Sequence, residues 1–195
     1  MGNFFSKVEQ FVKESFTKIG QESQIKHFER TVYWIKKLNP KCDEALLISA
    51  IAHDIERAYR TKEQHEKITG VGFTHTEFFR PHEEKGAEII AEFLKKEKAN
   101  QTLIQKVKML ISRHEEGGNE EQNLLKDADS LSFFENNIPS FLKKVKEQGK
   151  ENIRKKFDWM FERITSQNAK KIAKPWYEKA IKDLGEPCER TLCGL

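Results

Sequence analysis

Leu46-Leu47-Ile48-Ser49-Ala50-Ile51-Ala52-His53-Asp54 is an apolar run that ends in a histidine and an aspartate. A run of this kind, with no polar alternation, is typical of a buried helix. Asp43 stands just before it and is a preferred N-cap residue, so we expect a helix from Asp43 through Asp54. Burying a His or Asp among apolar side chains costs free energy unless the residue is paired or bound to a metal.

Helical spacing of apolar residues continues along most of the chain, and strand-like alternation is nearly absent. Residues 61–80 contain two glycines and no clear period, so they predict a loop, with a short helix as the alternative. Pro81 then fits the first turn of the next helix. The expected helices cover residues 3–18, 22–38, 43–54, 81–94, 103–114 and 124–131, with two or three more past Pro139.

The composition excludes several classes of protein. The chain has 195 residues, enough to bury a real core in one domain. Its 35 basic and 31 acidic residues leave a net charge of +4, so we expect no nucleic-acid partner. The basic residues between Lys143 and Lys156 alternate with glutamates and predict a solvated face. We expect no membrane span or secretory leader, and the three cysteines without C-x-x-C spacing predict a cytoplasmic protein with reduced thiols.

A set of histidines and aspartates stands at the ends or on the faces of these predicted helices. Its members are His27, His53, Asp54, His82, His114 and Asp129. Imidazole nitrogens and carboxylate oxygens are good ligands for Fe, Mn, Co, Ni and Zn. In helical bundles such ligands project inward from several helices and meet at the centre. The set therefore predicts a site for two divalent transition-metal ions.

The order His27, His53-Asp54, His82, His114, Asp129 resembles the HD-domain superfamily of metal-dependent phosphohydrolases over roughly residues 22–135. The surroundings also match, in His27-Phe-Glu-Arg-Thr-Val, Ala52-His53-Asp54-Ile and Asp127-Ala128-Asp129-Ser-Leu. The additional pair of His82 and His114 looks like the two-metal branch. The helical periodicity and the lack of repeats or a linker predict a single all-α domain over residues 1–195, and the resemblance implies a helical bundle of the HD type. An amphipathic helix (1–21) and C-terminal helices (136–195) would flank its 22–135 core.

The resemblance also implies how the ligands divide. His27, His53, Asp54 and Asp129 would hold one ion, and Asp54 would bridge to a second ion held by His82 and His114. The implied reaction is hydrolysis of a phosphate mono- or diester, of a nucleotide or a small phosphorylated metabolite, by a metal-activated hydroxide.

The expected catalytic residues are Asp54, Arg57 and Lys85, with Arg60 and Arg113 as further candidates for phosphate binding. The superfamily commonly has a glycine shortly after the His-Asp dipeptide, whereas this chain has Glu56-Arg57. We expect these two residues to form an ion pair that changes which substrate fits.

Two other functions remain open on the sequence. A few relatives use the same ligand pattern in a mixed-valent di-iron oxygenase, which a lysine near the second metal, Lys85 or Lys108, would favour. The other is a non-catalytic nucleotide-binding module. His65 and His75 fall outside the ligand pattern and are expected in an exposed loop.

The N-terminal residues allow two interpretations. Met1-Gly2-Asn3-Phe4-Phe5-Ser6 fits the pattern for N-myristoylation. We favour instead an amphipathic helix whose Phe4, Phe11 and Phe16 pack on the bundle, or across a homodimer.

Overall fold

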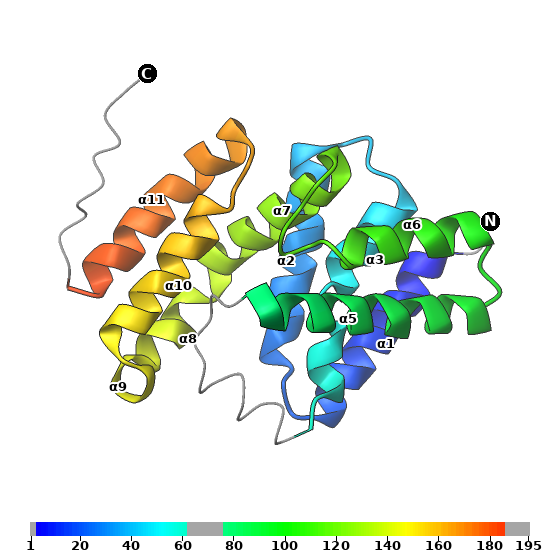
Figure 1. Cartoon of the computed structure of the whole chain (residues 1–195), viewed down its shortest axis with the longest axis horizontal. Helices are drawn as coiled ribbons and strands as arrows, with labels where there is room; N and C mark the ends of the chain where they lie inside the picture. The colour runs from blue at the N-terminus through cyan, green and yellow to red at the C-terminus, as the bar shows by residue number, and fades with distance from the viewer. Residues whose placement is uncertain (1–2, 62–75, 186–195) are drawn as a thin grey trace.

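The computed structural model describes residues 3–61 and 76–185, and every regular element in these residues is helical, as the sequence predicts. Figure 1 shows the helices in chain order: α1 (Phe4–Lys18), α2 (Ser23–Leu38), α3 (Glu44–Ala52), the 3₁₀ helix η1 (Ile55–Tyr59), α5 (Thr76–Lys96), α6 (Gln101–Ile111), α7 (Glu120–Asn136), α8 (Ile138–Lys143), α9 (Val145–Gln148), α10 (Lys150–Glu162) and α11 (Gln167–Asp183).

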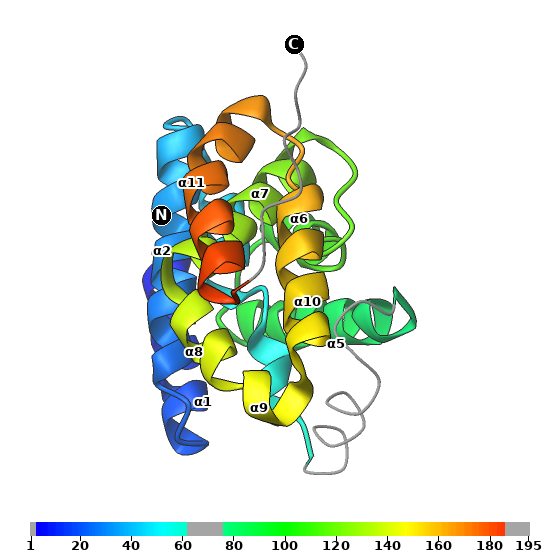
Figure 2. The same cartoon turned by 90° about the vertical axis from the view of Figure 1, so that its left-hand side faces the viewer.

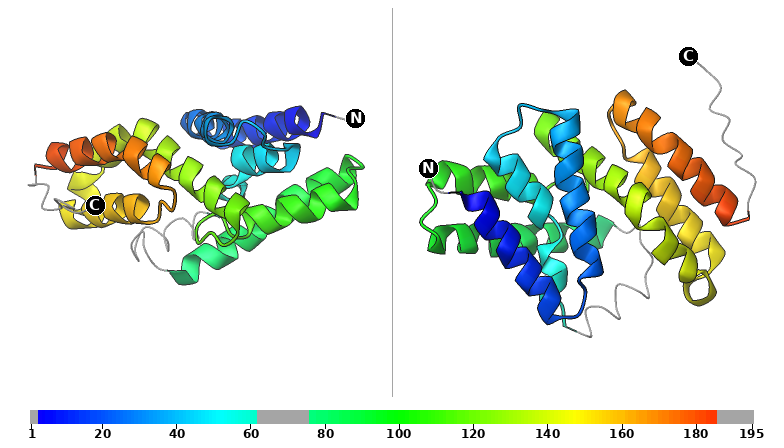
Figure 3. Two further views of the ribbon diagram at one scale, coloured as in Figure 1. Left: turned by 90° about the horizontal axis from the view of Figure 1, so that it is seen from above. Right: turned by 180° about the vertical axis from the view of Figure 1, so that it is seen from behind.

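Two apolar clusters hold these helices together. The first joins α1, α2, α3, α5, α6 and the first half of α7, and the second joins the rest of α7 to α8, α10 and α11. Helix α7 runs from one group of helices to the other (Figure 3). Residues 125–134 of α7 are all buried, because the apolar side chains enter the two clusters and the polar ones contact neighbouring parts of the chain. Figure 2 shows the C-terminal helices that pack against it.

The N-terminal helix packs on the first cluster, as its aromatic stripe predicts. Phe16 is fully buried, and its ring centroid lies 4.9 Å from that of Phe28 on α2. Phe28 in turn lies edge-on to the His53 ring at 5.5 Å. Phe11 stacks on Phe93 of α5 at 4.4 Å. Helix α1 therefore supports the elements that carry the candidate ligands.

Two helices end earlier than the sequence predicts. Asp43 caps α3 as expected, its carboxylate accepting the N–H of Leu46, but α3 ends at Ala52 instead of running through Asp54. The backbone tightens there into η1, with three residues per turn. Helix α6 likewise ends at Ile111, and His114 lies in the turn that follows. Apolar periodicity does not distinguish a helix from a tighter turn that buries the same residues.

The beginning of α5 also differs from the prediction. The helix starts at Thr76, so Pro81 lies inside it instead of in its first turn. A proline inside a helix removes one backbone hydrogen bond. The buried Ala87, Ile90 and Leu94 anchor the helix on the first cluster beyond that point. Gly2, His65 and His75 lie outside the described residues.

No helix within residues 3–61 and 76–185 is both long enough and apolar enough to cross a membrane.

The packing of α1 yields a stability prediction. Phe16→Ala should lower the free energy of unfolding by about 3–5 kcal/mol, because it leaves a cavity next to Phe28. Ile19→Ala, at the exposed end of the same helix, should change it by no more than about 0.5 kcal/mol. Urea unfolding measures both values. Equal effects of the two substitutions would contradict the packing of α1 described above.

Candidate metal centre

The predicted ligands come from five parts of the chain and meet in the interior. His27 lies in α2, His82 in α5 and Asp129 in α7. His53 and Asp54 form the junction between α3 and η1. All six predicted ligands, including His114 in the turn after α6, are at most 6% exposed.

Asp54 lies between three of the histidines. Its Oδ1 is 3.0 Å from His82 Nε2 and 3.8 Å from His114 Nε2. Its Oδ2 is 3.6 Å from His53 Nε2. The two oxygens of this carboxylate therefore face different histidines.

Asp129 closes the other side of the cluster. Its Oδ1 lies 3.0 Å from His27 Nε2 and 3.4 Å from His53 Nε2. The structure thus brings all six residues together, and the Nε2 atom of each of these four histidines points at Asp54 or Asp129.

The opposite ring nitrogens are held by acceptors. His53 Nδ1 donates to the carbonyl oxygen of Ala50 (2.9 Å), and His114 Nδ1 donates to that of Ile111 (2.8 Å). His82 Nδ1 donates to Glu56 Oε2 at 2.7 Å. His27 Nδ1 lies 2.8 Å from Ser132 Oγ, whose own proton goes to the carbonyl oxygen of His27 at 2.7 Å. With Nδ1 occupied in all four rings, Nε2 is the nitrogen that can bind a metal.

Two buried nitrogens of the cluster lack a hydrogen-bond partner among the described residues. They are His53 Nε2 and His114 Nε2. A buried polar atom without a partner costs free energy, and a metal ion would supply one. The donor set therefore fits a bound ion.

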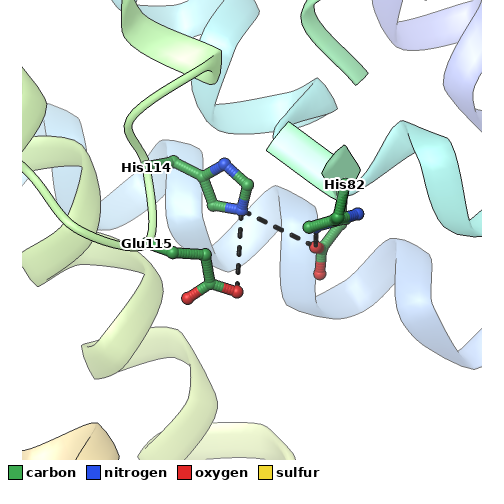
Figure 4. A group of neighbouring side chains, drawn as sticks. His82, His114 and Glu115 are labelled. Carbon is green, nitrogen blue, oxygen red and sulfur yellow. Dashed lines mark hydrogen bonds and ion pairs between the residues drawn. The ribbon is translucent and has the colours of Figure 1, made fainter. Parts of the chain in front are cut away.

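The ligand atoms form two groups that share Asp54. One contains His27, His53 and Asp54, the other Asp54, His82, His114 and Glu115, and within each group the atoms lie within 4.8 Å of one another. Figure 4 shows two contacts of one ring nitrogen of His114, one with a carboxylate oxygen of Glu115 and one with an oxygen next to His82, which belongs to Asp54. Glu115 Oε1 lies 3.8 Å from His114 Nε2. This buried cluster of His, Asp and Glu side chains can hold metal ions.

Charge within the cluster is balanced by its neighbours. Burial by itself would raise the pKa of Asp54, but Arg57 and then His53 hold that pKa well below its usual range. Burial would lower the pKa of His53, yet Asp54 and Asp129 raise it to about 9. Burial lowers the pKa of His114 to about 4. A metal that binds here would displace the proton of His53 and meet an already neutral His114.

The sequence predicts an ion pair between Glu56 and Arg57, but in the structure each of the two side chains has a different partner. Arg57 Nη2 lies 2.9 Å from Asp54 Oδ2, one helical turn back. Glu56 Oε2 accepts from Arg60 Nε as well as His82 Nδ1, each at 2.7 Å. The two side chains point to different partners because they are neighbours on a 3₁₀ turn.

Three other basic candidates lie away from the centre. Lys85 is exposed on α5, and no described contact joins it to the cluster. Arg113 donates to the carbonyl oxygen of Gly117 at 3.1 Å and holds the turn after His114. Lys108 lines a separate surface pocket with Glu84 and Glu88.

The sequence missed several residues at the centre. Glu115 directly follows His114, a proximity that could have drawn attention to it. Arg163, the C-cap of α10, pairs with Glu115 and Asp129, although it lies outside the 22–135 resemblance. Nothing in the sequence places its guanidinium there, because the contact depends on how α10 packs.

A cavity of about 290 Å³ leads to the ligands. His27, Asp54, Asp129 and Glu115 belong to its lining. The remaining wall combines basic and apolar side chains, among them Arg57, Arg60, Lys144, Lys156, Phe133, Phe141 and Met160. Lys144 and Lys156 thus line the pocket, whereas the sequence predicts a solvated face for this basic stretch.

Comparison with known proteins shows the family. The sequence model of a family described as "Domain of unknown function (DUF4202)" matches residues 9–183. The chain belongs to the DUF4202 family. No curated protein matches this DUF4202 chain.

A solved structure of similar fold is the crystal structure of a predicted HD superfamily hydrolase from an uncultured Thermotogales bacterium. It is 23% identical, with a TM-score of 0.56, and the match covers 92% of this chain and 88% of that chain. At this identity the likeness concerns the fold, which extends over the C-terminal helices as well as residues 22–135.

The shared carboxylate yields a prediction on metal stoichiometry. His27→Ala and His114→Ala each remove a nitrogen from a different group, so a two-metal centre predicts that each variant binds about one ion per chain where the wild type binds about two. Asp54→Ala should lose both ions, while His65→Ala should leave the content unchanged. Elemental analysis after dialysis against Mn²⁺ measures the number of bound ions per chain. Full metal content in Asp54→Ala would show that the ligands are elsewhere.

Proposed function

We propose that this DUF4202 chain is a metal-dependent phosphohydrolase with a two-metal centre. It would cleave a phosphate mono- or diester of a nucleotide or a small phosphorylated metabolite. The observation that carries the proposal is the convergence of four Nε2 atoms on Asp54 and Asp129, beside a cavity that four basic side chains also line. The likeness in fold to a predicted HD superfamily hydrolase supports it. The donor set suits Fe, Mn, Co, Ni or Zn.

Two such ions, when bound, supply a hydroxide nucleophile near neutral pH and offset the charge of the phosphate. The protein's part is to bind and orient the ester. Arg57 lines the cavity, and its guanidinium pairs with the Asp54 carboxylate. The guanidinium can therefore bind a phosphate oxygen next to the proposed ligands. Arg60 and Lys144 add positive charge to the lining of the same cavity.

Lys156 is suited to move a proton. It lines the cavity from α10, and burial lowers its pKa to about 8. Its Nζ then carries a proton at neutral pH and gives it up readily, which is what protonation of the leaving oxygen requires.

The apolar part of the wall limits the substrate. Phe133 and Phe141 lie with their ring centroids 5.1 Å apart, and Met160 lines the same cavity. A small organic group attached to the phosphate would pack against these side chains. The cavity lies at the small end of the range for ligand pockets, which favours a small phosphorylated compound over a polymer.

The oxygenase remains the second candidate. Neither Lys85 nor Lys108 lies at the centre, but Lys156 lines the cavity beside Glu115 and Asp129. Activity assays run with and without O₂ separate the two functions, because hydrolysis consumes no oxygen.

Arg57 yields a prediction on activity. Arg57→Ala should lower kcat/KM for phosphate esters by roughly 10- to 100-fold, the effect of losing one hydrogen bond to a charged group. The control is Arg30→Ala, which removes another partly buried arginine, paired with Glu135 outside the cavity. A panel of phosphate mono- and diesters with Mn²⁺ measures both. Unchanged kcat/KM in Arg57→Ala would remove Arg57 from the site.

A further inference from the structure

Arg163 joins the C-terminal helices to the metal centre. Its side chain is 6% exposed. Nε donates to Ser130 Oγ at 2.8 Å, Nη1 donates to Glu115 Oε2 and Nη2 donates to Asp129 Oδ2. One guanidinium thus holds two carboxylates and the hydroxyl next to one of them.

In both carboxylates, the oxygen that the guanidinium leaves free faces a histidine. Asp129 gives Oδ2 to the arginine and presents Oδ1 to His27 and His53, at 3.0 and 3.4 Å. Glu115 gives Oε2 to the arginine and presents Oε1 to His114 at 3.8 Å. The guanidinium therefore fixes the rotation of each carboxylate about its last bond.

We propose that Arg163 is a positioning residue that orients Asp129 and Glu115 as ligands of different ions, and that Glu115 is a ligand of the ion shared by His82 and His114. The inference rests on the proposed two-metal centre.

The backbone of Glu115 is held as well. Glu83 is fully buried next to His82, and its Oε1 accepts the backbone N–H of Glu115 at 2.7 Å. Glu115 is thus fixed from α5 through its main chain and from α10 through its side chain. A glutamate held at both ends loses little further freedom when it binds a metal.

Only an arginine suits this position. A guanidinium is planar and has several donors at fixed angles, so it can hold two separate carboxylates at once. A lysine ammonium is a point charge on a flexible stem and would hold either carboxylate loosely. Burial would lower the pKa of Arg163, but Asp129 and Glu115 outweigh it and keep the group charged.

The turn between α10 and α11 is fixed to the same stretch of α7. The Asp127 carboxylate accepts the backbone N–H groups of Thr165 and Ser166, both at 2.7 Å. The Trp159 ring lies 4.6 Å from the guanidinium carbon. Asp127 therefore holds the turn, while Arg163 contacts the ligands, and the two roles can be tested separately.

The test is Mn²⁺ affinity of the metal-free full chain, measured by isothermal titration calorimetry. Arg163→Met should weaken Mn²⁺ binding by about 10- to 100-fold, as loss of a residue that orients ligands does. Arg163→Lys should fall between it and the wild type. Asp127→Asn and Arg30→Met should bind Mn²⁺ as the wild type does, even where their melting temperatures fall. Glu115→Gln should weaken the binding of one ion and leave the other.

Wild-type affinity in Arg163→Met would overturn the inference, and so would an equal loss in Asp127→Asn, which would trace the effect to docking of the turn. Arg163→Lys serves if the methionine variant does not fold. A wild-type chain that binds no Mn²⁺ would overturn the proposed function itself, so the two failures are distinguishable.

Discussion

Four imidazole rings and three carboxylates lie together in the interior of this helical chain, and the rest of the structure has to compensate for their charge. Burying a charged group without a partner costs several kcal/mol. Arg57 pairs with Asp54, and Arg163 pairs with Asp129 and Glu115. The Nε2 atoms of His53 and His114 are buried without a hydrogen-bond partner among the described residues. A metal ion would supply that partner.

The need to compensate these buried charges explains how the C-terminal helices contribute to the candidate metal centre. They bury their own apolar cluster against α7, which also carries Asp129. From that position α10 delivers Arg163 to the ligands and Lys156 to the cavity. One side of the proposed site therefore comes from residues 22–135, and the other from the C-terminal helices.

The features predicted correctly from the sequence are those that depend on the spacing of nearby residues. Apolar periodicity gave the helical fold, and the Asp43 cap gave the beginning of α3. The six proposed ligands were predicted from their order and surroundings, and the structure brings their side chains together. The ends of α3 and α6 were predicted wrongly, because a tighter turn buries the same residues as a helix.

Contacts between segments that are distant in the chain could not be predicted from the sequence. Arg163 meets Asp129 only because α10 and α7 pack together, and no local pattern encodes that packing. The expected pair of Glu56 and Arg57 was wrong, because Glu56 pairs with His82 of α5 and Arg57 pairs with Asp54. Lys85 was expected at the site as a phosphate-binding residue, but it lies on the exposed side of α5.

Crystals of the full chain grown with Mn²⁺ would test the central claim most directly, through the anomalous scattering of the metal. Two peaks are predicted inside the cluster, about 3.5–4 Å apart and on either side of the Asp54 carboxylate. A single peak would contradict the two-metal centre. Manganese bound only outside these ligands, or no peak at all, would contradict the metal site altogether.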